Sequence, residues 1–381
     1  MRFEALLDRH ERGELSQGEA AELLGMSERT FRRHRDRLRE EGIEGLRDRR
    51  IGKPSRRRAA VEEIERMLGL YRADYGDFTV KHFHEQLQRR HGYKLGYTVT
   101  RLALHAAGLV RPAARRSAHR KKRPRRPLPG MMLHQDASRF AWLPGDARQY
   151  DLVVTLDDAT SEIYSAFLVA EEGTASTFRA LAEVIAKKGL FCALYSDRGA
   201  HYFHTPKAGG KVDPSKPTQV GRALAQLGIK HIAAYSPEAR GRSERVFRTL
   251  QDRLPKELRL AGIATLEAAN RWLAMHYIAA HNARFAVPAE QPGNAFAPDT
   301  KGLARDILAI QEERQVGNDN TVKWRRLFLQ LPPSPLRPHF VRATVRVHEY
   351  PDGTIAVFHG PHRLADYDAA GRLTTDHACA A

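Results

Sequence analysis

The sequence predicts a multidomain protein with three parts: all-α helical modules, a central α/β core with a mixed sheet flanked by helices, and a small β-barrel. Three observations carry this prediction. Apolar residues repeat with helical spacing over roughly the first 110 residues, short apolar runs then alternate with helical segments, and alternating Val, Thr and Phe mark the carboxyl-terminal region. With 381 residues, 42% of them hydrophobic, the chain can fill several cores.

Charge and cysteine content narrow the class of protein. The 63 Lys and Arg residues exceed the 45 Asp and Glu residues, and the net charge of +18 indicates a polyanionic partner, most often nucleic acid. Two cysteines, Cys192 and Cys379, are too few for a disulfide framework or a cysteine-based zinc site, which favours a reducing cytoplasm. Neither a signal peptide nor an apolar run of membrane-spanning length is expected.

Residues 1–48 are predicted to form a helix-turn-helix DNA-binding domain. Ser16 begins a capping box before a short helix, a glycine turn follows, and Ser27 can cap a second helix that buries Phe31. This basic helix has the pattern of one that lies in a DNA major groove. The expected DNA contacts are Glu28, Arg29, Thr30, Arg32 and Arg33. A helical hairpin with a solvated basic face is the alternative.

A second helical DNA-binding domain is expected over residues 58–110, with helices at 61–73, 79–90 and 98–107. The signal is weaker here, since any three-helix bundle would show the same apolar pattern.

A basic linker is expected over residues 111–128. Residues 111–127 hold nine Lys and Arg residues, no acid and three prolines, so this stretch can neither pack nor stay helical when free. We expect it to follow DNA phosphates, with a merely solubilising tether as the alternative. The expected phosphate contacts are Arg120, Lys121, Lys122, Arg125 and Arg126.

The α/β core is expected over residues 129–285. Strands are predicted at 132–135, 151–156, 163–169, 191–196 and 231–235, and helices at 174–188, 219–227, 237–260 and 265–282. The order up to residue 260 is therefore βββαβαβα. The Gly-, Pro- and Lys-rich stretch at 206–217 is predicted to be a surface insertion.

The carboxyl-terminal region is expected to comprise a linker at 286–319 and the small β-barrel at 320–370. Three alternating segments, at 322–331, 340–350 and 353–360, predict strands, with Asp352-Gly353 as a hairpin turn. Low hydrophobicity from His362 onward predicts a frayed end. The barrel can bind DNA, bind a second protomer or cap the core, and the sequence does not choose among these roles.

Three acids occupy the ends of core elements. Asp136 ends the first predicted strand, Asp197 follows the fourth, and Glu244 lies early in the long helix. If the first and fourth strands are neighbours, their carboxyl ends meet, and a helix alongside can bring a third carboxylate to the same point. Hard divalent cations need clustered oxygen ligands, and two ions about 3.5–4 Å apart can promote attack on a phosphodiester. That reaction needs carboxylates rather than nucleophilic side chains, although composition alone does not single these three acids out of the 45 Asp and Glu residues.

The words around these acids are more specific than the acids alone: LHQDAS at 133–138, YSDRGAHY at 195–202 and YSPEARGRSERVFRTLQDRL at 235–254. With them, nearly the whole chain resembles the DDE transposases and retroviral-type integrases, and most closely insertion-sequence transposases of the ISNCY type. The resemblance implies a ribonuclease-H-like core in which Asp136, Asp197 and Glu244 are catalytic and hold two Mg²⁺ or Mn²⁺ ions. Arg198 and His201 are expected beside these ligands, with a structural role for His201 as the alternative.

The interval between the last two acids departs from the family's usual spacing. Between Asp197 and Glu244 lie 46 residues, and the insertion at 206–217 accounts for most of the excess. Glu238 is the rival third carboxylate on another helical face, but the SER word at 243–245 matches the family's glutamate.

The remaining polar and aromatic candidates have separate interpretations. Asp157 and Asp158 end a strand but precede a loop, so we predict that they cap it. No cysteine supports a zinc site with the histidines near 201. Arg240, Arg242, Arg245 and Arg248 are expected to meet DNA phosphates beside the acids, with a solvated face as the alternative. Trp142, Trp272 and Trp324 are predicted core anchors.

The resemblance implies a DNA transposase that binds the terminal inverted repeats of its mobile element, cleaves at their 3′ ends and joins these ends to target DNA. It implies a homodimer or higher multimer on double-stranded DNA, in the bacterial cytoplasm and associated with the nucleoid. One alternative is a transposase-derived, sequence-specific regulator without catalysis, which the triad disfavours because three converging acids repel one another without a metal. A structure-specific nuclease is the other, disfavoured by two duplex-binding modules.

Overall fold

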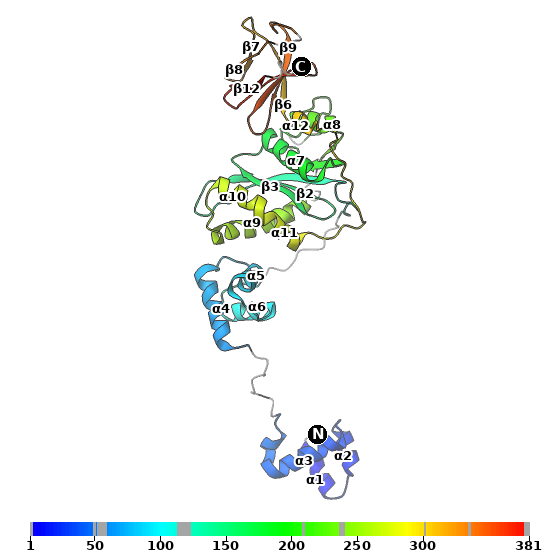
Figure 1. The fold of residues 1–381 in the computed structure, drawn as a ribbon. Coiled ribbons are helices and arrows are strands. Elements are labelled where there is room, and N and C mark those ends of the chain that lie inside the picture. Colours follow the sequence, from blue (N-terminus) through cyan, green and yellow to red (C-terminus); the bar gives the residue numbers. More distant parts are fainter. Residues whose placement is uncertain are drawn as a thin grey trace. The chain divides into compact units, whose positions relative to one another are not determined.

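The chain folds as two units in the computed structural model, which describes residues 3–48, 51, 59–112, 123–207, 210–235, 241–300, 302–333 and 337–376 (Figure 1). The first unit comprises Met1–Asp74 and Leu87–Val110, and the second comprises Tyr75–Gln86 and Arg111–Ala381. No helix within the described ranges is long and apolar enough to cross a membrane.

The first unit begins with a helix that the sequence analysis did not predict, α1 (Phe3–Glu11), followed by α2 (Gln17–Leu23), α3 (Glu28–Glu41) and the 3₁₀ helix η1 (Gly42–Leu46). The predicted capping box is present, since the Ser16 side chain accepts from the Glu19 N–H and the Glu19 carboxylate accepts from the Ser16 N–H. Ser27 caps α3 as predicted. Phe31, fully buried, packs in one cluster with Leu7, Ala20 and Ala21.

The three further helices predicted before the linker are confirmed. They are α4 (Val61–Asp74), α5 (Val80–His91) and α6 (Tyr97–Ala106). The residues of α5 up to Gln86 belong to the second unit and the rest to the first.

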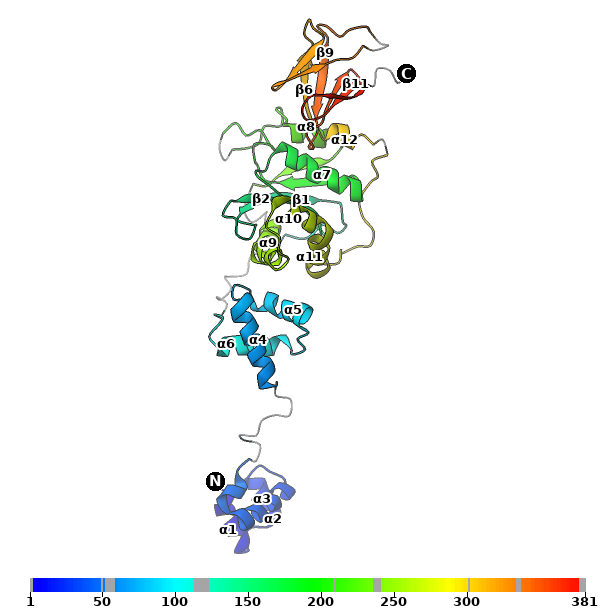
Figure 2. The same ribbon diagram turned by 60° about the vertical axis from the view of Figure 1, so that its left-hand side comes forward.

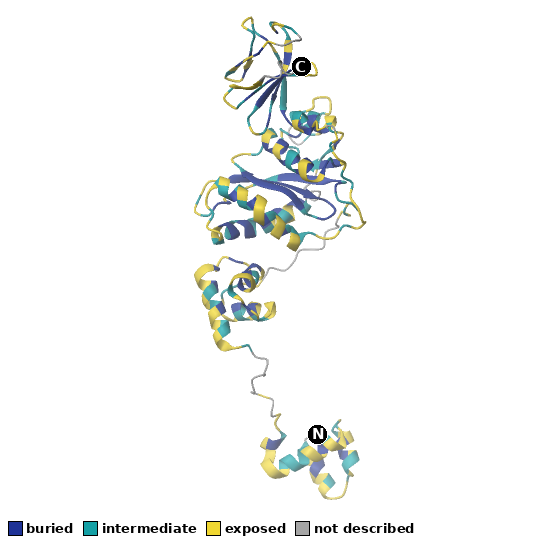
Figure 3. Cartoon of the chain, in the orientation of Figure 1, coloured by how far each residue is buried: buried dark blue, intermediate teal, exposed yellow. Residues whose placement is uncertain are grey.

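The central sheet of the second unit is mixed, as predicted. Its strands are β1 (Leu133–Phe140), β2 (Tyr150–Asp157), β3 (Ile163–Val169), β4 (Ala193–Ser196) and β5 (Lys230–Ala233). The spatial order is β3-β2-β1-β4-β5. β2 pairs antiparallel with β1 and β3, whereas β4 pairs parallel with β1 and β5. Every residue of β2 is buried because helices cover both faces, as the dark central strands in Figure 3 show.

Helices α7 (Thr174–Lys188) and α8 (Gln219–Gln226) cover one face of this sheet (Figure 2). The other face carries α9 (Gly241–Leu260), α10 (Leu266–Trp272) and α11 (Ile278–Phe285). The predicted single helix at 265–282 contains a π-helical turn, Leu273–Tyr277, between α10 and α11. Trp142 is a core anchor, as predicted, and Trp272 packs partly buried against the same cluster.

The carboxyl-terminal region contains α12 (Ala304–Ile307) and the strands β6 (Ile310–Gln315), β7 (Thr321–Trp324), β8 (Leu327–Gln330), β9 (Thr344–Glu349), β10 (Ile355–His359), β11 (His362–Tyr367) and β12 (Leu373–Asp376). They form a five-stranded antiparallel sheet, β12-β11-β10-β9-β6, and a two-stranded sheet, β7-β8. The predicted barrel is wrong, because β6 and β12 are opposite edges that do not pair within the described residues.

The end of the chain, the linker at 286–319 and the turn at Asp352-Gly353 were also predicted for this region. The expected frayed end from His362 is wrong, because β11 buries Leu364 and Tyr367 in the core that also contains Trp324. The expected linker at 286–319 contains β6, an edge strand of the larger sheet. The turn at Asp352-Gly353 is confirmed, with Gly353 at φ +83° and the Asp352 carboxylate accepting from the Thr354 N–H.

Candidate active site

Asp136 and Asp197 lie at the same level on neighbouring strands. β1 and β4 are parallel, with Leu133 paired to Leu194 and His134 to Tyr195. Two further residues along this register, Asp136 stands opposite Asp197, which directly follows β4. Neighbouring strands lie about 4.8 Å apart, so the two carboxylates start from adjacent backbone positions. Asp136 is only 7% exposed.

Both aspartates belong to the face of the sheet that carries α9. Val154, the β2 partner of Asp136, packs in one apolar cluster with Phe247 and Leu250 of α9. On β4, Leu194 belongs to the cluster on the opposite face. Because successive strand side chains alternate between faces, the position of Asp197 falls on the α9 side together with that of Asp136.

Glu244 lies in the first turn of α9, between two contacts that tie this helix to β1. The Gln251 side chain of α9 donates to Ser138 Oγ at 2.9 Å. Near the start of the helix, Arg242 pairs with Asp158, whose carboxylate also accepts from His134 Nε2 at 2.7 Å. The helix therefore runs along β1 in the same direction as the strand. The Glu244 side chain itself is exposed.

A fourth carboxylate, Glu172, lies in the loop after β3 and was not singled out in the sequence. Its Oε1 atom accepts from the buried Tyr202 hydroxyl at 3.2 Å and lies 3.6 Å from His201 Nε2. Burial, together with the negative charges of Glu172, Asp197 and Asp136, raises the pKa of Tyr202 well above its usual value. Tyr202 therefore experiences the charges of all three acids.

Histidines line the side of this region formed by β4 and β5. Ser196 Oγ lies 2.9 Å from His231 Nε2, and the His231 ring stacks on Phe203 with centroids 3.9 Å apart. Burial, and then the neighbouring His201, lower the pKa of His231 to about 4. His231 is therefore neutral near pH 7 and adds no positive charge beside Asp197.

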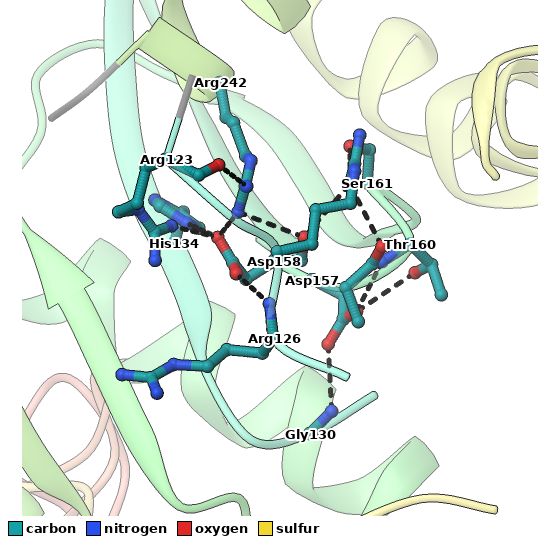
Figure 4. Close-up of polar contacts among 11 residues, drawn as sticks. Arg123, Arg126, Gly130, His134, Asp157, Asp158, Thr160, Ser161 and Arg242 are labelled. Atoms are coloured by element: carbon teal, nitrogen blue, oxygen red, sulfur yellow. Dashed lines mark hydrogen bonds and ion pairs between the residues drawn. The ribbon is translucent and has the colours of Figure 1, made fainter. Parts of the chain in front are cut away.

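Two adjacent aspartates at the β2–β3 turn form a network of hydrogen bonds and ion pairs (Figure 4). Asp157 accepts from the Thr160 N–H and hydroxyl and from the Gly130 N–H, which confirms its predicted role as a cap. Asp158 was predicted to cap the same loop, but the bonds of its carboxylate go to other segments of the chain. Its carboxylate, 0% exposed, accepts from His134, Arg123, Arg242 and the Arg126 N–H. Although burial alone would raise the pKa of Asp158, these partners lower it below its usual range.

The predicted basic contacts divide into internal and exposed groups. Arg242 is only 15% exposed and is paired with Asp158, and Arg125 donates to Asp158 O, Ala159 O and Ser161 Oγ. Arg198 donates to the Gly210 carbonyl at 2.5 Å. The Arg126, Arg245 and Arg248 side chains are exposed. Arg120, Lys121, Lys122, Arg240 and the rival acid Glu238 lie outside the described residues.

The amino-terminal part of α3 presents the predicted recognition residues. Arg29, Arg32 and Arg33 are exposed on the helix, while Phe31 points into the core. Thr30 is partly buried, and its hydroxyl lies 2.9 Å from Ser27 Oγ. Glu28 accepts a hydrogen bond from Gln17 of α2 at 3.2 Å. The helix thus presents three exposed basic side chains near its amino-terminal end.

The donors around Asp136 suit a hard cation but do not form a complete site. Carboxylate oxygens are the ligands that Mg²⁺ and Mn²⁺ prefer, and no cysteine lies among these residues. Within the described ranges, however, no three His, Cys, Asp or Glu side chains are placed to hold a metal ion together. The structure brings Asp136 and Asp197 together and leaves Glu244 on the neighbouring helix.

The sequence analysis missed the contacts made by Glu172, Asp158 and Gln251. Asp158 was identified only as a cap, although two acids following an apolar strand are a signal that at least one of them needs a cationic partner. No comparable signal marks Glu172 or Gln251, because their partners lie 29 or more residues away.

The chain is similar in sequence to known proteins. A family model described as a helix-turn-helix domain matches residues 2–55. The chain is 32% identical over 366 residues to "Putative transposase y4bF" of Sinorhizobium fredii (strain NBRC 101917 / NGR234), covering 93% of this chain and 79% of that relative. It is 28% identical over 345 residues to "Transposase for insertion sequence IS1202" of Streptococcus pneumoniae, covering 79% and 71% of the two chains.

Two solved structures are also similar. The HTLV-2 integrase catalytic core domain in complex with magnesium matches at a TM-score of 0.29 and 18% identity, over 38% of this chain and 86% of that one. The simian T-cell lymphotropic virus intasome in complex with PP2A regulatory subunit B56 gamma matches at a TM-score of 0.35 and 16% identity, over 74% and 91%. The sequence relatives cover 93% and 79% of this chain. The chain therefore belongs to the transposase family.

Proposed function

We propose that this transposase binds the terminal inverted repeats of an insertion sequence, cleaves the DNA at their 3′ ends and transfers these ends to target DNA. The observation that carries the proposal is the register of β1 and β4, which puts Asp136 of β1 level with Asp197, directly after β4, on the face covered by α9. Glu244 is the third catalytic carboxylate, because Gln251 on one side of it contacts β1 and Arg242 on the other pairs with Asp158, which also binds His134 of β1.

The residues fit a divalent cation through the chemistry of their donors. Asp136, Asp197 and Glu244 would hold Mg²⁺ or Mn²⁺, two ions in all, with the exposed Glu244 side chain turning towards the aspartates. The chemistry that bound ions supply is activation of the attacking oxygen and stabilisation of the leaving oxygen at the phosphorus. His201, whose Nε2 atom lies 3.6 Å from Glu172 Oε1, would contact the phosphate that the aspartates receive.

DNA binding is assigned to two sets of exposed cations. The α3 side chains Arg29, Arg32 and Arg33 supply end recognition, with Glu28 and Thr30 at the start of the same helix. Arg245 and Arg248 of α9 contact phosphates beside the acids. Together with Arg126 and the basic linker, these groups give salt-dependent affinity. Concerted joining of two ends requires at least a homodimer on double-stranded DNA.

A second candidate function is sequence-specific DNA binding without catalysis. The observation that favours it is the absence, within the described part of the chain, of three acidic or histidine side chains placed around one metal position. Under this proposal the core serves as a scaffold and Glu244 remains a surface residue.

Cleavage of a labelled duplex that carries the element's end distinguishes the two. With Mg²⁺ or Mn²⁺, the wild type should cleave, and Asp136→Asn and Asp197→Asn should bind the duplex normally without cleaving it. Asp213→Asn is the matched control, because this carboxylate lies in the insertion and accepts there from the N–H and hydroxyl of Ser215. Full cleavage by either active-site variant would remove that residue from the site, and tight binding without cleavage by the wild type would favour the regulator.

A further inference from the structure

Asp158 is a buried charge with four hydrogen-bonding partners. Its side chain is 0% exposed, and its Oδ1 atom accepts from His134 Nε2 and from the guanidinium groups of Arg123 and Arg242. The Oδ2 atom accepts from the Arg126 N–H at 2.8 Å. A buried carboxylate is tolerated only with such partners, so the three segments that supply them are held at one point.

Two of these segments lead directly to proposed catalytic acids. His134 stands two residues before Asp136 on β1, and Arg242 stands two residues before Glu244 on α9. Arg242 also donates to the Arg123 carbonyl at 2.9 Å and to the Asp158 carbonyl at 3.3 Å. The guanidinium group is therefore fixed by three acceptors, and the first turn of α9 is fixed with it (Figure 4).

We propose that Asp158 is a positioning residue: through Arg242 it fixes the first turn of α9, and hence Glu244, relative to Asp136. The inference rests on the proposed function for its catalytic consequence but not for its structural one. The sequence analysis interpreted Arg242 as a phosphate contact. In this proposal Arg242 instead binds Asp158 inside the protein, and the exposed Arg245 and Arg248 contact phosphates.

The test compares wild type with Asp158→Asn, Arg242→Gln and Arg242→Lys in the full-length protein. Asp146→Asn is the matched control, because Asp146 pairs with Arg148 in the loop that joins β1 to β2, outside the network. Melting temperature and duplex binding confirm that each variant is folded. If Asp158→Asn does not fold, the two Arg242 variants are sufficient to test the proposal. Arg242 is less buried than Asp158, so its replacement should disturb the core less.

Three measurements give the outcome. Hydrogen exchange of the metal-free protein should be faster over residues 245–250 in Asp158→Asn and Arg242→Gln than in wild type. Mn²⁺ affinity, followed by its electron paramagnetic resonance signal, and the cleavage rate should each fall about 10–100-fold, the usual effect of removing a group that orients a metal ligand. Arg242→Lys, which keeps the charge beside Asp158 but lacks the guanidinium fork, should recover part of each loss, and Asp146→Asn should match wild type.

The double variant Asp158→Asn/Arg242→Gln should lose no more than the worse single variant, because both act through one contact. Wild-type exchange over 245–250 and wild-type Mn²⁺ affinity in Arg242→Gln would overturn the inference. A wild type that binds DNA but does not cleave it would contradict the proposed function alone, since the exchange measurement still decides the positioning role.

Discussion

His281 of α11 should make the second unit lose stability in mild acid. The side chain is 4% exposed, its ring lies 4.7 Å from the Phe285 ring, and its Nδ1 atom has no hydrogen-bond partner among the residues that the structure describes. Burial, and then the Arg253 charge, lower the pKa of His281 to about 4 from an unfolded value of 6.5. Between these two values the unfolded chain binds more protons than the folded one, so stability falls as the pH falls.

The size of the effect follows from the two pKa values. The difference between them corresponds to a total of about 3 kcal/mol, of which about 2 kcal/mol is lost by pH 5. Replacing His281 with Phe keeps an aromatic ring beside Tyr277 and Phe285 and removes the titrating group. The stability difference between His281→Phe and wild type should therefore shift by about 2 kcal/mol in favour of the variant between pH 7.5 and pH 5.

Urea unfolding followed by tryptophan fluorescence measures this difference, because all three tryptophans, Trp142, Trp272 and Trp324, lie in the second unit. His276→Phe is the matched control, since His276 is exposed in the same helical segment and should leave the pH dependence unchanged. An identical pH dependence in wild type and His281→Phe would refute the reasoning.

Three further predictions concern the recognition helix and the carboxyl-terminal sheet. Phe31→Ala should cost about 3–5 kcal/mol in the helix-turn-helix core and abolish end binding, whereas tight binding by this variant would contradict the packing account. Arg33→Gln should weaken end binding and lower the salt slope by about one, measured by fluorescence anisotropy, and an unchanged slope would argue against a phosphate contact. Gly353→Ala should destabilise the larger sheet by about 1 kcal/mol in thermal melts, because Gly353 has φ +83° and an added Cβ would meet Ala369 Cβ at 3.3 Å; equal melting temperatures would contradict this.

The central sheet could be predicted because its signals are local. The continuous apolar run Ile163–Val169 predicted β3, and the helical spacing over Thr174–Lys188 predicted α7, each with the bounds observed. The π-helical turn Leu273–Tyr277 could not be predicted, because a local change in the hydrogen-bond register leaves the apolar spacing of the sequence nearly intact.

The fold of the carboxyl-terminal region was harder to predict, because it depends on pairing between segments that lie far apart in the sequence. The polar alternation in His362–Tyr367 belongs to a strand with one buried face, and whether a sheet closes depends on its two edges, β6 and β12, which no local pattern relates.

The candidate site shows the same division. The family resemblance, carried by the sequence around the acids, predicted that Asp136 and Asp197 would meet, and the parallel register of β1 and β4 puts the two positions level with each other. The role of Asp158 could not be predicted, because its partners come from positions 123, 126, 134 and 242. From the sequence one can predict that a buried charge needs partners, but not where in the chain these partners lie.

The central claim is that Glu244 completes a metal-dependent site with the two aspartates. Mg²⁺-dependent cleavage and joining of a labelled duplex carrying the element's end tests it most directly, comparing wild type with Glu244→Gln at matched DNA occupancy and with paired ends present. The account predicts cleavage and joining by the wild type and neither reaction by Glu244→Gln, with end binding unchanged. Full activity of Glu244→Gln would contradict the claim.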